Sequence, residues 1–146
     1  MRLDRNVKVV KIDLDFLMQI NIISYHIISY HIQTMYTEIF NDTYTIQVGA
    51  NQAENDALVK KAPQHAMWFH LKDFPSAHAV VVNTAKAGVI DADAIRRAAT
   101  LVKDRAAPGV RSLQNVGVNY LPAKYVRRTE TPGKVIMAKA AKCVQV

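Results

Sequence analysis

Glycine and proline divide residues 35–146 into short segments, and this punctuation constrains the fold more than any other feature. Apolar or alternating runs that end at such residues are typical of strands, and two further segments have helical spacing. Because the helices and strands do not alternate regularly, we predict a single compact α+β domain with a mixed or mainly antiparallel sheet and about two helices. The expected strands are residues 44–48, 66–71, 78–82, 116–120, 134–138 and 142–146, and the expected helices are residues 51–61 and 92–105.

Polar residues precede both predicted helices where a side chain can cap free backbone N–H groups. Asn51 precedes the first helix and Asp91 precedes the second. In the second helix, apolar residues recur at the spacing of one buried face, which leaves Arg96 and Arg97 mostly outside it. We therefore expect this helix to present a cationic surface.

Residues 1–34 differ from the rest of the chain. Residues 16–37 contain no Asp, Glu, Lys or Arg, and the pentapeptide Ile-Ile-Ser-Tyr-His stands twice in tandem at residues 22–31. A transmembrane helix and a secretory signal are alternatives, but polar residues interrupt the apolar run and early acidic residues interrupt the cationic start of a signal. We expect instead a β-rich or poorly ordered extension without membrane contact. A natural start at Met35 is a further hypothesis, which mass spectrometry of the natural protein decides.

Positive charge is concentrated in the C-terminal part of the chain. Residues 95–146 contain eleven Lys and Arg against two acidic residues, a formal charge of +9, whereas residues 1–94 sum to −2. Such asymmetry is typical of a phosphate-binding surface, and the alternative is a solvated face kept for solubility. The single cysteine, Cys143, excludes an internal disulfide and a cysteine zinc site, and we expect a cytoplasmic protein.

Catalytic motifs are absent from the sequence. It contains no Gly-rich phosphate loop, no Gly-x-Ser-x-Gly elbow and no His-Glu-x-x-His pair. The best catalytic candidates are His70, Asp73 and His78, which would serve a small hydrolase or nuclease as a metal site or a general base. No nucleophile accompanies them, so we expect no enzyme, no metal and no cofactor.

A binding face is the stronger interpretation. In the predicted strand at residues 66–71, strand geometry places Trp68 and His70 on one face, together with Lys72. An aromatic face beside a cation can stack an unpaired base while the cation contacts phosphate. The alternatives are core packing for Trp68 and a structural role for His70 and His78.

Residues 44–82 carry a more specific pattern. Residues 44–61 read YTIQVGANQAENDALVKK and residues 67–82 read MWFHLKDFPSAHAVVV. Together with the Val-Asn-Tyr, basic and Pro-Gly-Lys-Val segments that follow, residues 40–146 resemble the NFACT RNA-binding domain. The segment at residues 75–78 is similar to the stand-alone, short members of that family. Ala50 departs from the pattern, because the family often has a basic residue there.

The resemblance implies a module that binds RNA, either tRNA or ribosomal RNA, with a connection to the large ribosomal subunit and to ribosome-associated quality control. DNA is a further partner to consider. The other regions of the large family members are missing from residues 1–146, so ribosome anchoring and peptide-tail synthesis are not carried over. We predict these residues as nucleic-acid contacts: Asn51, Asn55, Lys60, Lys61, Trp68, His70, Lys72, His78, Arg96, Arg97, Lys124, Arg127, Arg128 and Lys134.

Two other functions remain open at this point. The basic face can belong to a protein-interaction module that docks on a ribosomal protein or a translation factor. It can also bind DNA and RNA alike as a generic polyanion surface, through phosphate contacts that carry no sequence information.

Overall fold

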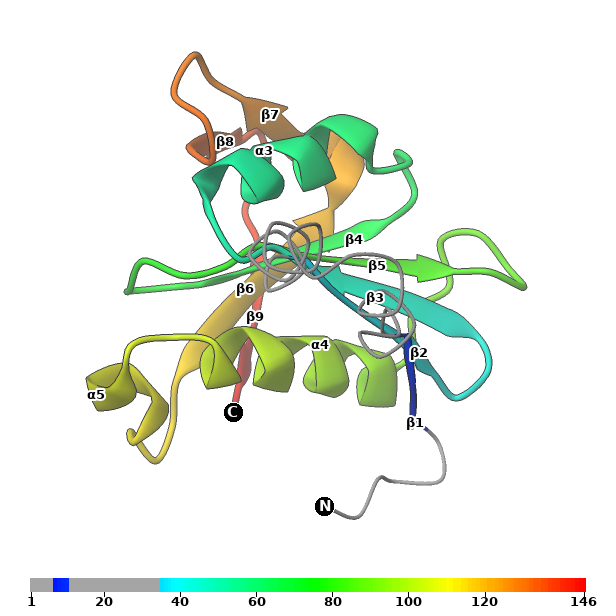
Figure 1. Cartoon of the computed structure of the whole chain (residues 1–146). Helices are drawn as coiled ribbons and strands as arrows, with labels where there is room; N and C mark the ends of the chain where they lie inside the picture. Colours follow the sequence, from blue (N-terminus) through cyan, green and yellow to red (C-terminus); the bar gives the residue numbers. More distant parts are fainter. Residues whose placement is uncertain (1–6, 11–34) are drawn as a thin grey trace, which may run out of the picture.

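The computed structural model describes residues 7–10 and 35–146, which form a seven-stranded sheet, a two-stranded ribbon and three α-helices (Figure 1). The sheet has the order β1-β2-β3-β5-β4-β6-β9, and all its neighbouring strands are antiparallel. Its strands are β1 (Val7–Val10), β2 (Tyr36–Phe40), β3 (Tyr44–Val48), β4 (Met67–Leu71), β5 (Ala79–Asn83), β6 (Gly117–Pro122) and β9 (Lys142–Gln145). The other elements are α3 (Gln52–Lys61), α4 (Ala92–Asp104), α5 (Pro108–Arg111), the 3-10 helix η1 (Ala123–Tyr125), and the ribbon strands β7 (Val126–Arg128) and β8 (Val135–Met137).

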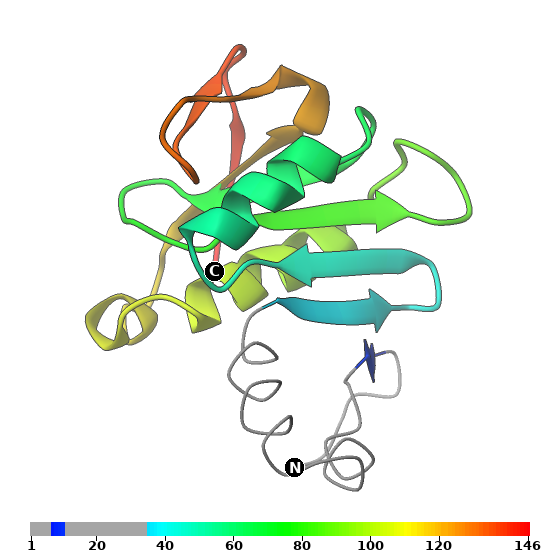
Figure 2. The ribbon, with the colours of Figure 1, turned by 45° about the horizontal axis from the view of Figure 1, so that its top comes forward.

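The sheet has a different cover on each face. Figure 2 shows α3 in front of the strands and α4 behind them, and in Figure 1 the β7–β8 ribbon lies on the same side as α3. Strand alternation assigns the residues of β4 to these two sides. Trp68 packs in a small core with Leu58 of α3, whereas Phe69 and Leu71 pack in the main core with residues of α4.

A buried ion pair fastens α4 to the sheet. Glu38 of β2 is 0% exposed, and its two carboxylate oxygens accept hydrogen bonds of 2.6 and 2.7 Å from the Arg97 guanidinium. The hydroxyl of Tyr36 donates to the same carboxylate at 2.6 Å. Burial, followed by this hydrogen bond, raises the pKa of Tyr36 to about 12. The carboxylate is therefore fully paired, as a buried charge must be.

The predicted α+β class is confirmed, and the two predicted helix caps are present. The Asn51 side chain accepts a hydrogen bond from the backbone of Glu54, and the Asp91 side chain accepts one from Ala94. Five elements were not predicted individually: β1, β2, α5, η1 and β7. Pro108, which follows the predicted helix at residues 92–105, begins α5, since its missing N–H costs nothing at the first helical position.

Most of residues 1–34, where we expected a separate extension, lies outside the described residues. The described exception is β1, which pairs with β2. Of the helices that the structure describes, none has the length and apolar character needed to cross a membrane. The transmembrane alternative considered for residues 16–37 falls almost wholly outside the described range.

Arg97→Ala should destabilise the domain strongly, because it leaves the buried Glu38 carboxylate without its cation. Loss of one partner of a buried pair costs about 3–5 kcal/mol. Chemical denaturation gives the free energy of unfolding. The matched control is Arg96→Ala, which removes an exposed arginine from the same helix and should cost less than about 1 kcal/mol. Equal losses of unfolding free energy in the two variants would contradict the stabilising role given to the Arg97–Glu38 pair.

Candidate nucleic-acid interface

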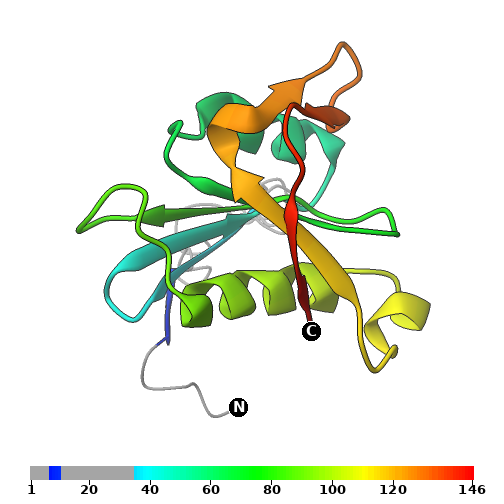
Figure 3. The ribbon, with the colours of Figure 1, turned by 180° about the vertical axis from the view of Figure 1, so that it is seen from behind.

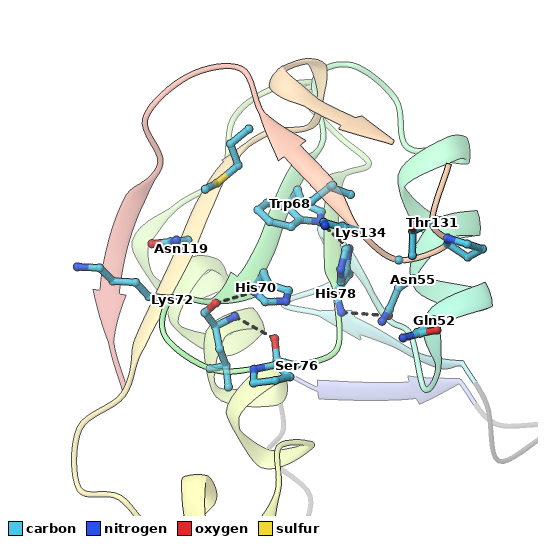
Figure 4. Close-up of a pocket in the computed structure, with 16 residues that line it drawn as sticks. Gln52, Asn55, Trp68, His70, Lys72, Ser76, His78, Asn119, Thr131 and Lys134 are labelled. Carbon is cyan, nitrogen blue, oxygen red and sulfur yellow. Dashed lines mark hydrogen bonds between the residues drawn. The ribbon is translucent and has the colours of Figure 1, made fainter. Parts of the chain in front are cut away.

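A pocket of about 580 Å³, here called the central pocket, opens on the α3 side of the sheet (Figure 4). Its walls come from β4, the loop that joins β4 to β5, the start of α3, and the turn and second strand of the β7–β8 ribbon. The residues that line it are Gln52, Asn55, Trp68, His70, Leu71, Lys72, Pro75, Ser76, His78, Asn119, Thr131, Pro132, Gly133, Lys134, Val135 and Met137.

His78 is held in a single tautomer at the back of this pocket. The indole N–H of Trp68 donates to His78 Nδ1 at 3.0 Å, and an indole nitrogen can only donate. His78 Nε2 therefore carries the hydrogen of the neutral ring, and the backbone of Gly133 accepts it. Burial, and then the neighbouring His70, lower the pKa of His78 to about 4. The imidazole is thus neutral at physiological pH and has both nitrogens engaged.

His70 presents a free acceptor to the same pocket. Its Nδ1 lies 2.6 Å from the Leu71 carbonyl, which can only accept, so Nδ1 carries the hydrogen and Nε2 has a lone pair. Burial lowers the pKa of His70, which keeps the ring neutral. The two imidazoles meet edge to face with their centroids 5.1 Å apart. Asn119 lies directly opposite His70 in the register of β4 and β6, and its side-chain amide lines the pocket.

The loop that carries His78 is fixed by hydrogen bonds to its backbone. The N–H of His78 donates to Asn55 Oδ1 at 3.1 Å, and its carbonyl accepts from the N–H of Gly49 at 3.0 Å. A Cβ atom at Gly49 would lie 2.2 Å from Asn55 Oδ1, so only glycine fits there. At the near end of the loop, the N–H of Leu71 donates to the Ser76 hydroxyl at 3.0 Å.

The ribbon forms the opposite wall and is tied to α3. The Arg128 guanidinium donates two hydrogen bonds to Asp56, at 2.6 and 3.1 Å, and these lower the pKa of the Asp56 carboxyl. Gly133 has a φ of +80°, and a Cβ atom there would lie 3.2 Å from the backbone of Gln52. The ribbon turn therefore needs glycine both for its conformation and for its close approach to the helix.

The structure brings six of the predicted contact residues to the central pocket and places the others elsewhere. Lys72 and Lys134 are exposed at its rim, on different walls, and provide its positive charge. Lys60 and Lys61 are exposed in the last turn of α3, and Arg127 is exposed on β7. The six that line the pocket are Asn55, Trp68, His70, Lys72, His78 and Lys134; the others are Asn51, Lys60, Lys61, Arg96, Arg97, Lys124, Arg127 and Arg128.

The prediction that Trp68 offers an open stacking surface is wrong. Trp68 is only 2% exposed, because α3 and the ribbon cover the face of β4 that it shares with His70. The ring of His70 stacks against it at a centroid distance of 5.8 Å and an interplanar angle of 11°. The core-packing alternative holds for Trp68, and its polar role is to orient His78.

Several other predicted contacts are committed to partners within the protein. Asn51 caps α3, and Asn55 is buried against the His78 backbone. Arg97 is paired with Glu38 and Arg128 with Asp56. Arg96 is exposed and donates to the Gln145 carbonyl at 3.2 Å. The two ion pairs occupy guanidinium N–H groups of Arg97 and Arg128 that a phosphate would need.

Sequence reasoning missed four polar residues of the pocket: Gln52, Ser76, Asn119 and Thr131. Asn119 had a usable signal, since it alternates with apolar neighbours in a predicted strand.

Asp73 does not line the pocket, and in residues 35–146 no group of three or more His, Cys, Asp and Glu side chains is placed to hold a metal ion. The alternative metal site at His70, Asp73 and His78 is therefore not assembled among the described residues.

Stability should fall in acid because His78 is buried as the neutral form. In the unfolded chain His78 has the ordinary pKa of 6.5, whereas in the folded chain it is about 4, so the unfolded chain binds the proton more tightly. The stabilisation is complete above pH 6.5 and is lost as the pH falls towards 4, by about 3 kcal/mol in all. Urea denaturation followed by the fluorescence of Trp68, the single tryptophan, measures it.

The control for this measurement is His78→Gln, whose amide oxygen can still accept from the Trp68 indole but cannot titrate near neutral pH. Its free energy of unfolding should depend less steeply on pH over the same interval. Parallel pH profiles in the two proteins would contradict the assignment to His78.

Known proteins that are similar to this chain include the following two. Coiled-coil domain-containing protein 25 of Mus musculus is 30% identical over 96 residues, which are 64% of this chain and 45% of that protein. The solved C-terminal structure of the fibronectin/fibrinogen-binding protein from Streptococcus suis has a TM-score of 0.62 and 29% identity, over 70% of this chain and 40% of that chain. The matched part therefore spans less than half of either relative.

The family expected from residues 44–82 is confirmed. Residues 33–139 match the NFACT protein RNA binding domain family, and the match includes every residue that lines the central pocket. Since the matched range is well over half of the sequence, the chain belongs to the NFACT protein RNA binding domain family.

Proposed function

We propose that this RNA-binding module holds one unpaired nucleotide of a tRNA or a ribosomal RNA in the central pocket, with the adjoining phosphates at Lys72 and Lys134. The observation that carries the proposal is the pairing of a neutral, hydrogen-bonding floor with a cationic rim in one pocket. A base and its ribose are neutral and polar, whereas the flanking phosphates are anions, so a nucleotide has the same division of charge.

The size of the pocket favours a single nucleotide over a duplex. At about 580 Å³ it lies in the range of small-ligand sites, roughly 300–1,000 Å³. A base in a duplex is stacked and paired, and cannot enter a concave site without leaving the helix. Proteins that read RNA sequence mostly take unpaired bases from loops and ends.

The floor has the donors and acceptors to contact a base edge. His70 Nε2 is an acceptor, and the amide of Asn119 beside it offers a donor and an acceptor. Exocyclic amines and ring N–H groups of bases match the His70 acceptor. His78 and Trp68 act behind them as positioning residues, since their polar atoms bond to each other and to the Gly133 backbone.

The wider role follows from the RNA that is bound. A domain that takes unpaired nucleotides of tRNA or large-subunit ribosomal RNA fits a cytoplasmic function at the ribosome, including ribosome-associated quality control. Crosslinking the full chain to total cellular RNA, followed by sequencing of the retained RNA, tests whether tRNA or ribosomal RNA is bound. Enrichment of tRNA or ribosomal RNA supports it, and equal retention of DNA and RNA contradicts it in favour of a generic polyanion surface.

The double variant Lys72→Ala and Lys134→Ala should bind a short single-stranded RNA at least about tenfold more weakly, because each lysine contributes a charge-assisted contact. Two lost phosphate contacts should also lower the slope of log affinity against log salt by about 1.4. Fluorescence anisotropy at several salt concentrations gives both quantities. The control is Lys86→Ala with Arg111→Ala, which removes two exposed cations that do not line the pocket.

His70→Ala should lower the affinity for the same RNA without changing the slope of log affinity against log salt. The reason is that a neutral imidazole contacts the base and not phosphate. Replacing the bound nucleotide by an abasic one should then have little further effect in this variant. A lower salt slope in His70→Ala, or an unchanged affinity, would contradict the role given to His70.

A further inference from the structure

A second cavity, here called the lysine groove, lies near the sheet edge that β6 and β9 form, beside the start of α4. Figure 3 shows these two strands side by side with α4 behind them. The groove has a volume of about 370 Å³, and none of its described lining residues also lines the central pocket. Half-buried apolar side chains of Met67, Ile90 and Ile95 contribute to its floor.

The rim of the lysine groove is cationic. Among the residues that the structure describes, Lys124, Lys139 and Lys142 line it, and no acidic side chain does. The ammonium groups of Lys124 and Lys139 lie 5.0 and 5.2 Å from the centroid of the Tyr125 ring. These cation–π contacts hold two flexible lysines in place before any partner arrives, which reduces the entropy lost on binding.

The aromatic rings of the groove are poorly suited to nucleic-acid bases. The Tyr125 ring is already covered by the two ammonium groups. Tyr120 stacks on Phe69 with a centroid distance of 5.7 Å and an interplanar angle of 22°, so one of its faces is taken. A base needs an open ring to stack on, whereas an aliphatic or aromatic side chain needs only apolar area, which the floor supplies.

The neighbouring strand β9 offers backbone groups to an extended partner. It is the last strand in the sheet order, and Val116 and Val146 exchange both of their backbone hydrogen bonds. Every second position on an antiparallel strand points its N–H and C=O the other way. Those of Cys143, opposite Asn119, therefore face away from β6, where the described part of the chain places no strand.

We propose that the lysine groove binds an extended acidic segment of a partner protein, with an apolar side chain on the isoleucine floor and carboxylates at Lys124 and Lys139. Charge complementarity selects the acidic partner, and the covered rings select a peptide over an RNA. This is a second interaction surface, separate from the central pocket. The domain would then hold RNA and a partner protein at the same time.

A random peptide library displayed on phage tests the proposal directly. It is selected in parallel against the full-length protein and against the double variant Lys124→Glu and Lys139→Glu. We expect the unaltered protein to enrich peptides that combine several Asp or Glu with one or two large apolar residues. Representative peptides should bind the double variant at least about tenfold more weakly.

Two controls separate the groove from charge and folding effects. Lys86→Glu with Arg111→Glu makes the same charge change at exposed positions that line neither cavity. This control variant should bind the selected peptides as tightly as the unaltered protein does. Thermal melting shows whether each variant is folded. Ile95→Asp with the lysines intact should also lose the peptides, since it places a charge on the apolar floor.

Three outcomes would overturn the proposal. The first is no enrichment, or equal enrichment by the Lys124→Glu and Lys139→Glu variant. The second is selection of acidic peptides that still bind after their apolar residues are replaced by serine, which would indicate a simple polyanion surface. The third is loss of single-stranded RNA binding in that variant comparable to the loss in the Lys72→Ala and Lys134→Ala variant, which would make the groove part of the RNA surface.

Discussion

The backbone of His78 is the point on which the site depends. Its N–H is bonded to the side chain of Asn55 and its carbonyl to the backbone of Gly49, while its ring accepts from the Trp68 indole. These bonds join α3, the end of β3, β4 and the loop before β5. A buried polar group that lost its partner would cost about 1–3 kcal/mol, so each bond constrains the others to the observed geometry.

Ion pairing decides which of the basic residues can face a ligand. The chain has a net charge of +7, but Arg97 and Arg128 each make two hydrogen bonds to a carboxylate within the domain. Arginine suits such fixed, bidentate pairing, whereas lysine remains a solvated point charge. The cations left at the two cavities are lysines, a different set at each cavity, and this division underlies the two binding surfaces inferred above.

Local pattern predicted the elements better than it predicted the site. Strand alternation placed Trp68 and His70 on one face, and both helix caps followed from Asn51 and Asp91. The burial of Trp68 did not follow, because its cover comes from α3 and from a ribbon about sixty residues further along the chain. Arg128 and Asp56 are 72 residues apart, and such pairs appear only once the topology is known.

The central pocket is built from two stretches that are far apart in the order of synthesis. One wall comes from residues 52–78, and the other from residues 131–137, with Asn119 between them. A chain emerging from the ribosome from its N-terminus first exposes the histidine wall, while the ribbon that closes the pocket is still inside the exit tunnel. Under the function proposed above, the nascent domain has half a binding site, and we expect RNA affinity at the central pocket only once the turn at Gly133 has docked on α3.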